Sequence, residues 1–232
     1  PPVQLRLTVV PDHPCPYLPD RTARSRAFWI GSLPDDLYTR FMDSAFRRSG
    51  RVVYQPTCPQ CRACVPLRVN VERFVPSKSQ RRCWRRNADL KIHLAEPELT
   101  DEKFDLYCRF VKARHDDHKP QAREDLEAFL YESLVTTLEF EYRDPAGRLV
   151  AIGIGDVSST SFSSVYFYFD PSDSRRSLGT FGALYELDYA RQRGLSHYYL
   201  GYWIGPCESM RYKTAFRPYE LLGADGVWRQ AT

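Results

Sequence analysis

Three cysteines at two consecutive three-residue spacings form the clearest candidate metal site in the sequence. They are Cys58, Cys61 and Cys64. A tight turn brings thiolates at this spacing within bonding range of one tetrahedral ion. Cys15, in Cys15-Pro-Tyr-Leu, is a candidate fourth ligand. The set would suit a zinc ion or an iron–sulfur cluster, and the alternative is a loop of reduced thiols without metal.

A run of positive charge follows the cysteines, because the segment 73–86 contains no acidic residue. If residues 77–88 form a helix capped by Ser77 or Ser79, five cations spaced by three and four share one face. We predict that this face binds an RNA backbone, with Trp84 as a stacking surface. A solvated face balanced by acids elsewhere is the alternative. The five cations are Lys78, Arg81, Arg82, Arg85 and Arg86.

A strand-to-helix junction in the second half is a candidate anion site. The aromatic strand that ends at Asp170 is followed by Ser174-Arg-Arg-Ser-Leu-Gly-Thr180, which opens a helix. Free backbone N–H groups and the helix dipole favour negative charge at such a junction. Gly179 is the only glycine of this loop, so the segment is neither a P-loop nor a dinucleotide fingerprint. An ordinary turn explains it about as well.

The elements that position these residues change type along the chain. Residues 1–30 are rich in proline and predict irregular structure, and residues 35–48 predict a helix closed by Gly50. Strands and helices alternate after that, and Asp144-Pro-Ala-Gly147 predicts a hairpin. We therefore predict an α+β fold with a mixed sheet flanked by helices. The helices are expected at 77–88, 100–115, 126–135, 181–193 and 208–216, and the strands at 52–54, 65–71, 137–143, 149–157, 164–169 and 197–202.

Composition and charge narrow the class of protein. Of the 232 residues 43% are apolar and 27% charged, as in an ordinary globular protein, and the net charge of +4 is a weak sign of an acidic partner. No apolar stretch approaches the roughly 18–20 residues that span a bilayer, and the start does not look like a secretion signal. Seven cysteines make an odd number for a disulfide framework. We expect a cytoplasmic location with no membrane partner.

Several longer segments together match a known pattern. Those of the first half are Cys15-Pro-Tyr-Leu-Pro-Asp-Arg, Phe46-Arg-Arg-Ser-Gly-Arg, Tyr54-Gln-Pro-x-Cys-x-x-Cys-x-x-Cys, Ser79-Gln-Arg-Arg and Arg86-Asn-Ala-Asp-Leu. Those of the second half are Tyr168-Phe-Asp-Pro, Arg176-Ser-Leu-Gly-Thr, Tyr199-Leu-Gly-Tyr-Trp-Ile and Met210-x-Tyr-Lys-x-x-Phe-x-Pro. Over about residues 15–222 the chain resembles the arginyl-tRNA–protein transferase family. It is most similar to the short bacterial branch, the aspartate/glutamate leucyltransferases.

The resemblance implies an acyltransferase-like (GNAT) core that uses aminoacyl-tRNA instead of acetyl-CoA. Residues 91–232 would form this catalytic region, and residues 1–90 a smaller region with the cysteines and the basic segment. The implied partners are leucyl-tRNA and proteins that begin with Asp or Glu, which the transfer marks for the N-degron route of degradation; no DNA partner is implied. Gly205-Pro206 departs from the expected Pro-Gly order. The alternatives are an arginyl donor, a non-catalytic zinc-containing RNA-binding module, or an N-acetyltransferase that uses acetyl-CoA.

The implied reaction is mainly a positioning problem, because aminoacyl-tRNA is an activated ester and no cofactor is required for the chemistry. One weak base and a donor to the oxyanion would suffice. The candidate bases, each more often structural in proteins at large, are Asp156, Asp170 and Glu208. The candidate donors are Tyr168, Tyr202 and the backbone near Ser177, Gly179 and Thr180. The candidate cations for the acidic acceptor are Arg47, Arg48, Arg176, Arg211 and Lys213, and the leucine side chain would contact Phe167, Tyr202 and Trp203.

Overall fold

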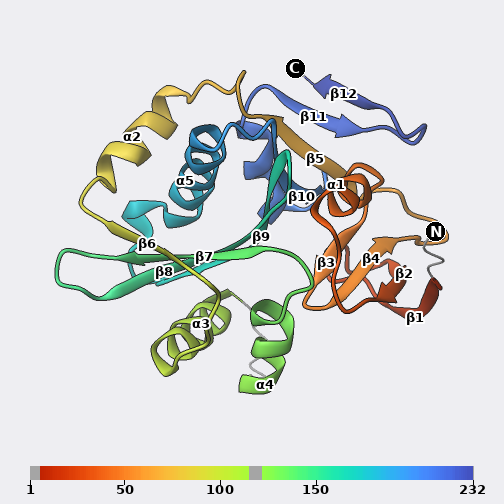
Figure 1. The fold of residues 1–232 in the computed structure, drawn as a ribbon, viewed down its shortest axis with the longest axis horizontal. Coiled ribbons are helices and arrows are strands. Elements are labelled where there is room, and N and C mark those ends of the chain that lie inside the picture. The colour runs from red at the N-terminus through yellow and green to blue at the C-terminus, as the bar shows by residue number, and fades with distance from the viewer. Residues whose placement is uncertain (1–5, 115–121, 232) are drawn as a thin grey trace.

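The protein contains two β-sheets, with helices on both faces of the larger one (Figure 1). The computed structural model describes residues 6–114 and 122–231. The large sheet is mixed and has eight strands, in the order β12-β11-β5-β10-β9-β8-β7-β6. The predicted α+β class is therefore confirmed. The strands of this sheet are β5 (Val65–Asn70), β6 (Lys91–Ala95), β7 (Thr137–Arg143), β8 (Leu149–Val157), β9 (Ser161–Phe169), β10 (His197–Trp203), β11 (Tyr219–Leu222) and β12 (Trp228–Ala231).

The predicted hairpin between β7 and β8 is confirmed. The Asp144 carboxylate accepts hydrogen bonds of 3.0 Å from the backbone N–H groups of Ala146 and Arg148, which closes the turn. At the other side of the sheet, β5 lies between β11 and β10 and pairs antiparallel with both. The large sheet thus contains a strand from the first 90 residues, and the boundary at residue 90 stays a prediction.

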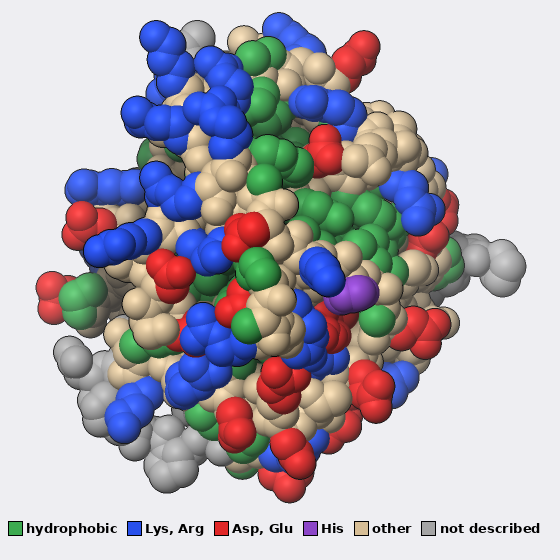
Figure 2. Space-filling model, turned by 90° about the vertical axis from the view of Figure 1, so that its left-hand side faces the viewer, with side chains coloured by type: hydrophobic (Ala, Val, Ile, Leu, Met, Phe, Trp, Pro, Cys, Tyr) green, Lys and Arg blue, Asp and Glu red, His purple; other side chains and the backbone are tan. Residues whose placement is uncertain are grey.

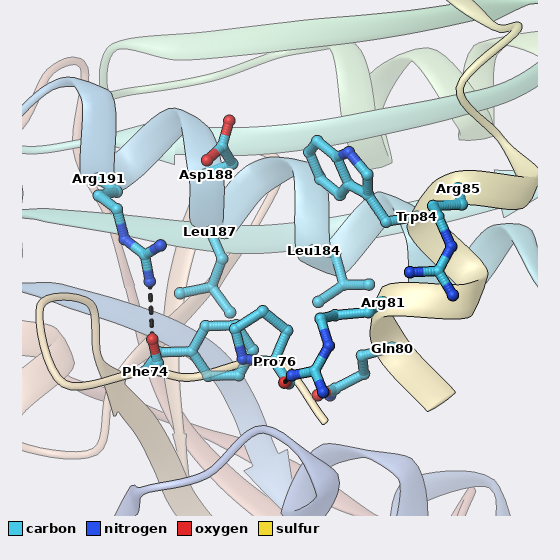
Figure 3. A pocket seen from close by; sticks show the side chains of 10 residues that line it. All are labelled: Phe74, Pro76, Gln80, Arg81, Trp84, Arg85, Leu184, Leu187, Asp188 and Arg191. Atoms are coloured by element: carbon cyan, nitrogen blue, oxygen red, sulfur yellow. Dashed lines mark hydrogen bonds between the residues drawn. The ribbon is translucent and has the colours of Figure 1, made fainter. Parts of the chain in front are cut away.

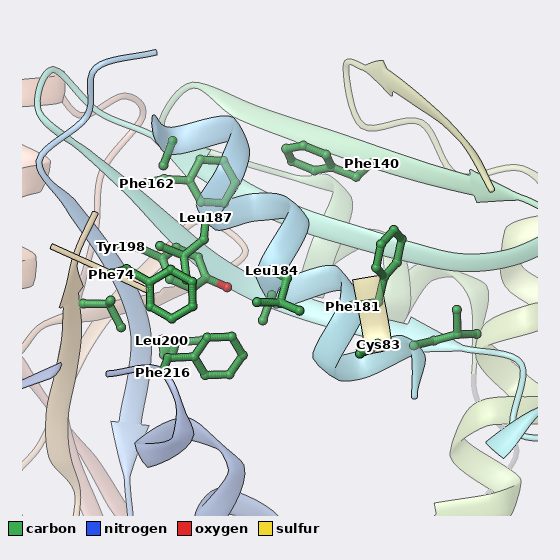
Figure 4. Close-up of a cluster of buried hydrophobic side chains, with 14 of the residues drawn as sticks. Phe74, Cys83, Phe140, Phe162, Phe181, Leu184, Leu187, Tyr198, Leu200 and Phe216 are labelled. Carbon is green, nitrogen blue, oxygen red and sulfur yellow. The ribbon is translucent and has the colours of Figure 1, made fainter. Parts of the chain in front are cut away.

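Two helices cover each face of the large sheet. Helices α2 (Lys78–Arg86) and α5 (Leu178–Gln192) lie on one face, and α3 (Asp101–Arg114) and α4 (Arg123–Leu126) lie on the other (Figure 1). Figure 4 shows the core under α5, where Leu184 and Leu187 pack with Phe74, Phe162 and other side chains. A second core of α3 residues, including Leu106, packs against the opposite face. This burial holds α5, and therefore its N-terminus, in a fixed position relative to β9.

Helix α2 forms as its sequence predicts. Ser77 accepts a hydrogen bond from the backbone of Gln80, and the Gln80 side chain accepts one from the backbone of Ser77, which makes a complete capping box. Gln80 and Cys83 are buried, while the basic residues of the helix are exposed. The helix predicted over 100–115 begins at Asp101 and reaches Arg114, and residue 115 lies outside the described part of the chain.

The first 56 residues differ most from the prediction. Residues 1–30 were predicted to be irregular, but residues 8–14 and 22–29 are strands of a four-stranded antiparallel sheet in the order β1-β2-β4-β3. Prolines are compatible with β1 because it is an edge strand. These strands are β1 (Thr8–Pro14), β2 (Thr22–Trp29), β3 (Arg47–Ser49) and β4 (Val52–Pro56).

The predicted helix over 35–48 is too long. Helix α1 ends at Asp43, Ala45 has a left-handed φ of 66°, and β3 then pairs with β4. Gly50 does not close a helix but makes the turn between β3 and β4, with a φ of 55°. A Cβ at this position would collide with the carbonyl oxygen of Ala128. The pairing of β3 with β4 and the close approach to Ala128, which is distant in sequence, override the helical pattern. Helix α1 spans Asp35–Asp43.

The remaining helical segments are short. The helix predicted over 126–135 is α4 followed by one π-helical turn, Glu127–Tyr131. The segment between β9 and α5 contains a 3-10 turn, η2 (Ser174–Arg176), and the predicted helix over 208–216 is a 3-10 helix, η3 (Glu208–Ala215). Among the described residues, no helix has both the length and the apolar composition needed to cross a bilayer.

Candidate active site

Strands β9 and β10 separate at one end of the large sheet. They pair in parallel only at three positions, from Ser161 opposite His197 to Ser163 opposite Tyr199. Strand β9 then continues to Phe169 beside β8, while β10 continues to Trp203 beside β5. The edges that face each other beyond these positions are therefore unpaired with one another, and side chains from other elements enter the gap between them.

Two cations, Arg47 from β3 and Lys213 from η3, lie at this gap. Arg47 Nη2 donates a 2.6 Å hydrogen bond to the Ser164 carbonyl, and Lys213 Nζ donates one of 2.6 Å to the Tyr202 carbonyl. Both approach Gly201, where φ is 77°: a Cβ there would lie 3.6 Å from Arg47 Nη2 and 3.7 Å from Lys213 Nζ. A glycine at this bulge of β10 thus leaves room for both cations.

Neither cation forms an ion pair with a carboxylate in the described part of the chain. Arg47 and Lys213 are only 9% and 7% exposed, and Arg47 Nη1 is buried without a hydrogen-bond partner among the residues described. Burial, and next the charge of Arg47, lower the pKa of Lys213 to about 7. Buried unpaired charge is costly. The burial of two neighbouring cations and the lowered pKa of Lys213 both favour binding of an anion between Arg47 and Lys213.

A cavity of about 560 Å³ lies beside the gap, at the N-terminus of α5. Ser177 has a left-handed φ of 54° and precedes the first residue of the helix, so the backbone turns sharply there. We call this cavity the donor cavity. Its lining includes Phe110, Phe167, Phe169, Ser177, Gly179, Thr180, Ser209 and Tyr212. It combines aromatic walls with backbone N–H groups at a helix N-terminus, which suits an apolar group attached to an anion.

A neighbouring cavity of about 420 Å³ connects the donor cavity to α2. It shares Ser177, Thr180 and Tyr212 with the donor cavity and adds Arg82 and Arg86. Figure 2 shows that Lys and Arg side chains gather on the upper part of the face that carries α2. The junction and the basic helix, which the sequence presents as separate candidates, therefore meet in one groove.

The five cations of α2 do not all point into that groove. Arg82 and Arg86 line it, whereas Arg81 and Arg85 line a separate cavity on the α5 side of the helix. Lys78 is exposed at the first turn. None of the five forms an ion pair within residues 6–114 and 122–231, although Asp188 lines the cavity that contains Arg81 and Arg85. The RNA-binding interpretation of this face stays a prediction.

Arg48 and Asp156, both predicted in the site, instead form a buried ion pair away from it. Arg48 Nη2 lies 2.5 Å from Asp156 Oδ1, and both side chains are fully buried. Tyr38 and Thr137 donate further hydrogen bonds of 2.7 and 2.8 Å to the same carboxylate. A fully buried carboxylate with so many donors is a poor general base, and the geometry argues for a structural role.

Tyr168 and Asp170 are also occupied by neighbouring groups. The Tyr168 hydroxyl is buried and lies 2.6 Å from the hydroxyl of Tyr131. Asp170 accepts hydrogen bonds from Ser172 and Arg109; burial acts to raise its pKa, but these bonds outweigh burial and lower it. Asp170 therefore holds the turn after β9. The geometry does not favour either residue as the base or as the oxyanion donor.

Some of the other predicted residues lie at the site, and others stabilise the segments around it. Arg176 is held by two 2.8 Å hydrogen bonds to the Asp89 carboxylate, so it ties η2 to the end of α2. The Tyr202 hydroxyl donates a 2.6 Å hydrogen bond to the Ala45 carbonyl, which supports the turn before Arg47. Trp203 is half-buried on the large core, and Glu208 and Arg211 are exposed on η3. Glu208 and Arg211 stay predictions.

The four predicted metal ligands lie near one another, but the structure does not confirm a metal site there. Burial raises the pKa of Cys64 to about 12, and the nearby Cys58, Cys15 and Cys61 add to this effect. Among the described residues, however, no three His, Cys, Asp or Glu side chains are arranged to hold a metal ion. The predicted zinc ion or iron–sulfur cluster is therefore unconfirmed. The ligand set Cys15, Cys58, Cys61 and Cys64 stays a prediction.

The fold, a large mixed sheet with helices on both faces, has a counterpart among solved structures. The C-terminal domain of a putative lysylphosphatidylglycerol synthetase from Agrobacterium fabrum has a similar fold, with a TM-score of 0.53 at 16% identity over 86% of this chain and 69% of that one. At that level of identity the likeness concerns the fold. The separated β9 and β10 and the helix N-terminus beside them are the parts of the fold that position a site.

Sequence comparison defines the family. A family model for the C terminus of arginine-tRNA-protein transferase matches residues 102–223, and one for the N terminus matches residues 13–82. Proteins named aspartate/glutamate leucyltransferase are similar over nearly their whole length. The one from Saccharophagus degradans is 37% identical over 94% of both chains, and the one from Hahella chejuensis is 40% identical over 93% of both. The chain belongs to the arginine-tRNA–protein transferase family and is an acyl-transferring enzyme.

Sequence reasoning missed several residues of the site. Phe110, Phe169, Ser209 and Tyr212 line the donor cavity, and Gly201 makes room for the two cations. Only Gly201 carried a local signal, as a glycine inside an otherwise aromatic strand. Phe110 comes from α3, which packs on the far side of the sheet from α2, so its place in the site depends on tertiary structure.

Proposed function

We propose that this enzyme transfers leucine from leucyl-tRNA to the N-terminal amine of proteins that begin with Asp or Glu. The observation that carries the proposal is the pair of buried cations Arg47 and Lys213 beside the donor cavity, neither of which forms an ion pair with a described carboxylate. An acceptor carboxylate would supply the missing negative charge. Asp and Glu side chains, unlike Lys or Ala, carry that charge close to the N-terminal amine. The name of the two relatives described above is in line with this assignment.

Leucyl-tRNA, the donor, would bind in the groove between α5 and α2. The 3′ end of the tRNA would place phosphates against Arg82, Arg86 and the N-terminus of α5. The leucine side chain would then lie among the aromatic walls of the donor cavity. Of the three side chains predicted to contact it, Phe167 lines this cavity. The ester would then lie near the gap between β9 and β10, where the acceptor carboxylate would be held.

In the reaction, the acceptor α-amine attacks the ester carbonyl carbon of leucyl-tRNA. A C–N bond forms, the bond between that carbon and the terminal ribose oxygen breaks, and the amine proton passes to the released ribose hydroxyl or to solvent. The α-amine has an ordinary pKa of about 7.7–8.0, so a fraction is neutral at physiological pH. Holding the amine and the ester together is therefore the main contribution of the enzyme. Glu208 is the remaining candidate base, and the α5 N-terminus the candidate oxyanion donor. No step requires the cysteines.

Incubation of the purified enzyme with charged tRNA and short peptides tests the proposal. Leucyl- and arginyl-tRNA are each combined with peptides that begin with Asp, Glu or Lys, and the peptide mass is measured. We expect one added leucine on the Asp and Glu peptides only. Addition of arginine instead would show that the donor assignment is wrong, and unchanged masses throughout would show that the reaction is wrong. Under this proposal the product enters N-degron degradation in the cytoplasm.

A further inference from the structure

A separate cavity of about 310 Å³ lies between α2 and α5 (Figure 3). We call it the α2–α5 pocket. Its apolar lining comes from Phe74, Leu184 and Leu187, and Trp84 and Arg85 reach it from α2, which faces α5 across it (Figure 3). This cavity is not the donor cavity, and the reaction described above does not use it. An apolar cavity with cationic side chains at its edge is therefore a candidate for a second binding site.

Trp84 is held as a flat surface at the pocket. Its ring stacks on Tyr185, with centroids 6.2 Å apart and an interplanar angle of 14°, and it also contacts Phe181 at 5.5 Å. Although these α5 residues support it in this way, the side chain is still 36% exposed. An aromatic ring that is packed from behind and partly open to solvent suits stacking of another flat ring.

The charged groups of the pocket are mostly positive. Arg81 donates a 2.5 Å hydrogen bond to the Pro76 carbonyl, and Arg191 donates one of 2.8 Å to the Phe74 carbonyl, so both keep their charge unneutralised. Arg85 forms no ion pair within the part of the chain that the structure describes. The one acid is Asp188, whose Oδ2 accepts a 2.7 Å hydrogen bond from Gln192. Its other carboxylate oxygen accepts no hydrogen bond from the described residues.

The pocket is adjacent to the groove proposed for the tRNA. Gln80 lines both the α2–α5 pocket and the cavity that contains Arg82 and Arg86. Positions 81 and 85 are rotated by about 100° about the helix axis from positions 82 and 86. The four arginines are therefore spread over the exposed side of α2. A single RNA strand that crosses the exposed side of α2 would have phosphates near Arg81 and Arg85 on one side of the helix and near Arg82 and Arg86 on the other.

We propose that the α2–α5 pocket binds one unpaired nucleobase of the RNA, stacked on Trp84. An exocyclic amino group of this base would donate a hydrogen bond to the Asp188 carboxylate, and the flanking phosphates would lie near Arg81 and Arg85. This inference rests on the proposed function, which makes an RNA the substrate. An acidic protein segment would also meet the arginines, but Asp188 would repel it. A base with an amino group uses all three features: the ring, the carboxylate and the cations.

RNA-binding measurements on matched variants test the pocket. We expect Trp84→Leu to weaken the affinity for uncharged tRNA about 5- to 150-fold, and Trp84→Phe to keep it within about threefold, because only the latter retains a stacking ring. Trp84→Leu should leave the slope of affinity against salt unchanged, whereas Arg85→Ala should reduce it by about one. Equal tRNA affinity of folded Trp84→Leu and the wild type would overturn the proposal.

The Asp188 contact is tested with single-stranded oligocytidine and oligouridine, two pyrimidine strands of which only cytosine carries the amino group. The wild type should prefer oligocytidine, and Asp188→Leu should lose that preference. Equal affinity of the wild type for both strands would overturn the amino-group contact. Preferential binding of an oligoglutamate peptide at this pocket would overturn the assignment to RNA.

A direct measurement covers the case that Trp84→Leu does not fold. Ultraviolet crosslinking of tRNA to the wild type, followed by mass analysis of peptides, should mark residues 74–85 and 184–191. Crosslinks confined to other segments would contradict the proposal. The two proposals also fail separately. If RNA binding depends on Trp84 but no leucine is transferred, only the proposed function is wrong; if leucine is transferred but Trp84 has no effect, only the pocket is.

Discussion

Arg47 and Lys213 approach the same glycine of β10, although 166 positions separate them in the sequence. A Cβ at Gly201 would lie 3.6 Å from Arg47 Nη2 and 3.7 Å from Lys213 Nζ. The small antiparallel sheet supplies one cation and the 3-10 helix after β10 supplies the other. Two like charges buried together are unfavourable for stability, and the acceptor carboxylate that we propose they bind would offset this cost.

The first prediction concerns acceptor recognition. Arg47→Met should raise KM for an Asp-starting peptide about 30-fold or more, because the carboxylate loses one partner of a buried charge pair. Affinity for leucyl-tRNA should change little. Arg176→Ala should have a much smaller effect on this KM, because Arg176 is already bound to Asp89. Steady-state kinetics with Asp- and Glu-starting peptides measure both effects, and Arg217→Ala, an exposed arginine nearby, is the control.

The second prediction concerns the pH dependence that Lys213 gives to stability. Its pKa is about 7 in the folded protein and about 10.4 in the unfolded chain, so the unfolded state binds more protons between these values. The free energy of unfolding should therefore rise as pH increases from 7 to 10. Lys213→Met should flatten this rise while Lys112→Met, an exposed control, should not. Thermal unfolding across this pH range measures it; identical slopes would contradict the burial of the amine.

The third prediction concerns Glu186, which is buried and accepts a 2.6 Å hydrogen bond from the Tyr198 hydroxyl. Burial raises its pKa to about 7, more than this hydrogen bond lowers it. The folded state therefore binds more protons than the unfolded chain between about pH 4.3 and 7, and stability falls as pH rises through that range. Glu186→Gln should raise Tm at pH 8 and have little effect at pH 4. A lower Tm at pH 8 would mean that the carboxylate is not desolvated.

The fourth prediction separates structure from catalysis at Asp156. Asp156→Ala should destabilise the fold by about 3–5 kcal/mol, because it leaves the buried Arg48 guanidinium unpaired. The kcat of the remaining folded enzyme, measured below the lowered Tm, should stay within about threefold of the wild type. A loss of kcat of several hundredfold in folded protein would instead restore Asp156 as the general base. Arg48→Met combined with Asp156→Ala should recover part of the lost stability.

The fifth prediction concerns the groove at α2. Arg82→Ala combined with Arg86→Ala should lower the slope of tRNA affinity against salt by about two, because each arginine neutralises about one phosphate. KM for the peptide should not change. Salt titrations of tRNA binding measure this, with Arg193→Ala on the exposed end of α5 as control. An unchanged slope would mean that the groove is merely solvated.

Local signals in the sequence determined several elements and surfaces directly. Ser77 and Gln80 specify the start of α2 through a capping box, and Asp144 specifies the turn of the β7–β8 hairpin. Residues 73–86 contain no acid, so α2 is a basic helix independently of the tertiary structure. In each case the physical cause lies within a few residues, so the pattern predicts the outcome.

Only the tertiary structure decided which charged residues form the site. Arg47 and Arg48 are neighbours in one motif, yet β3 alternates their side chains, so that one reaches the gap at Ser164 and the other pairs with Asp156. That alternation depends on pairing between β3 and β4, which the helical pattern of residues 35–48 concealed. Burial, pairing and pKa arise from contacts over more than 100 positions, and no local pattern records them.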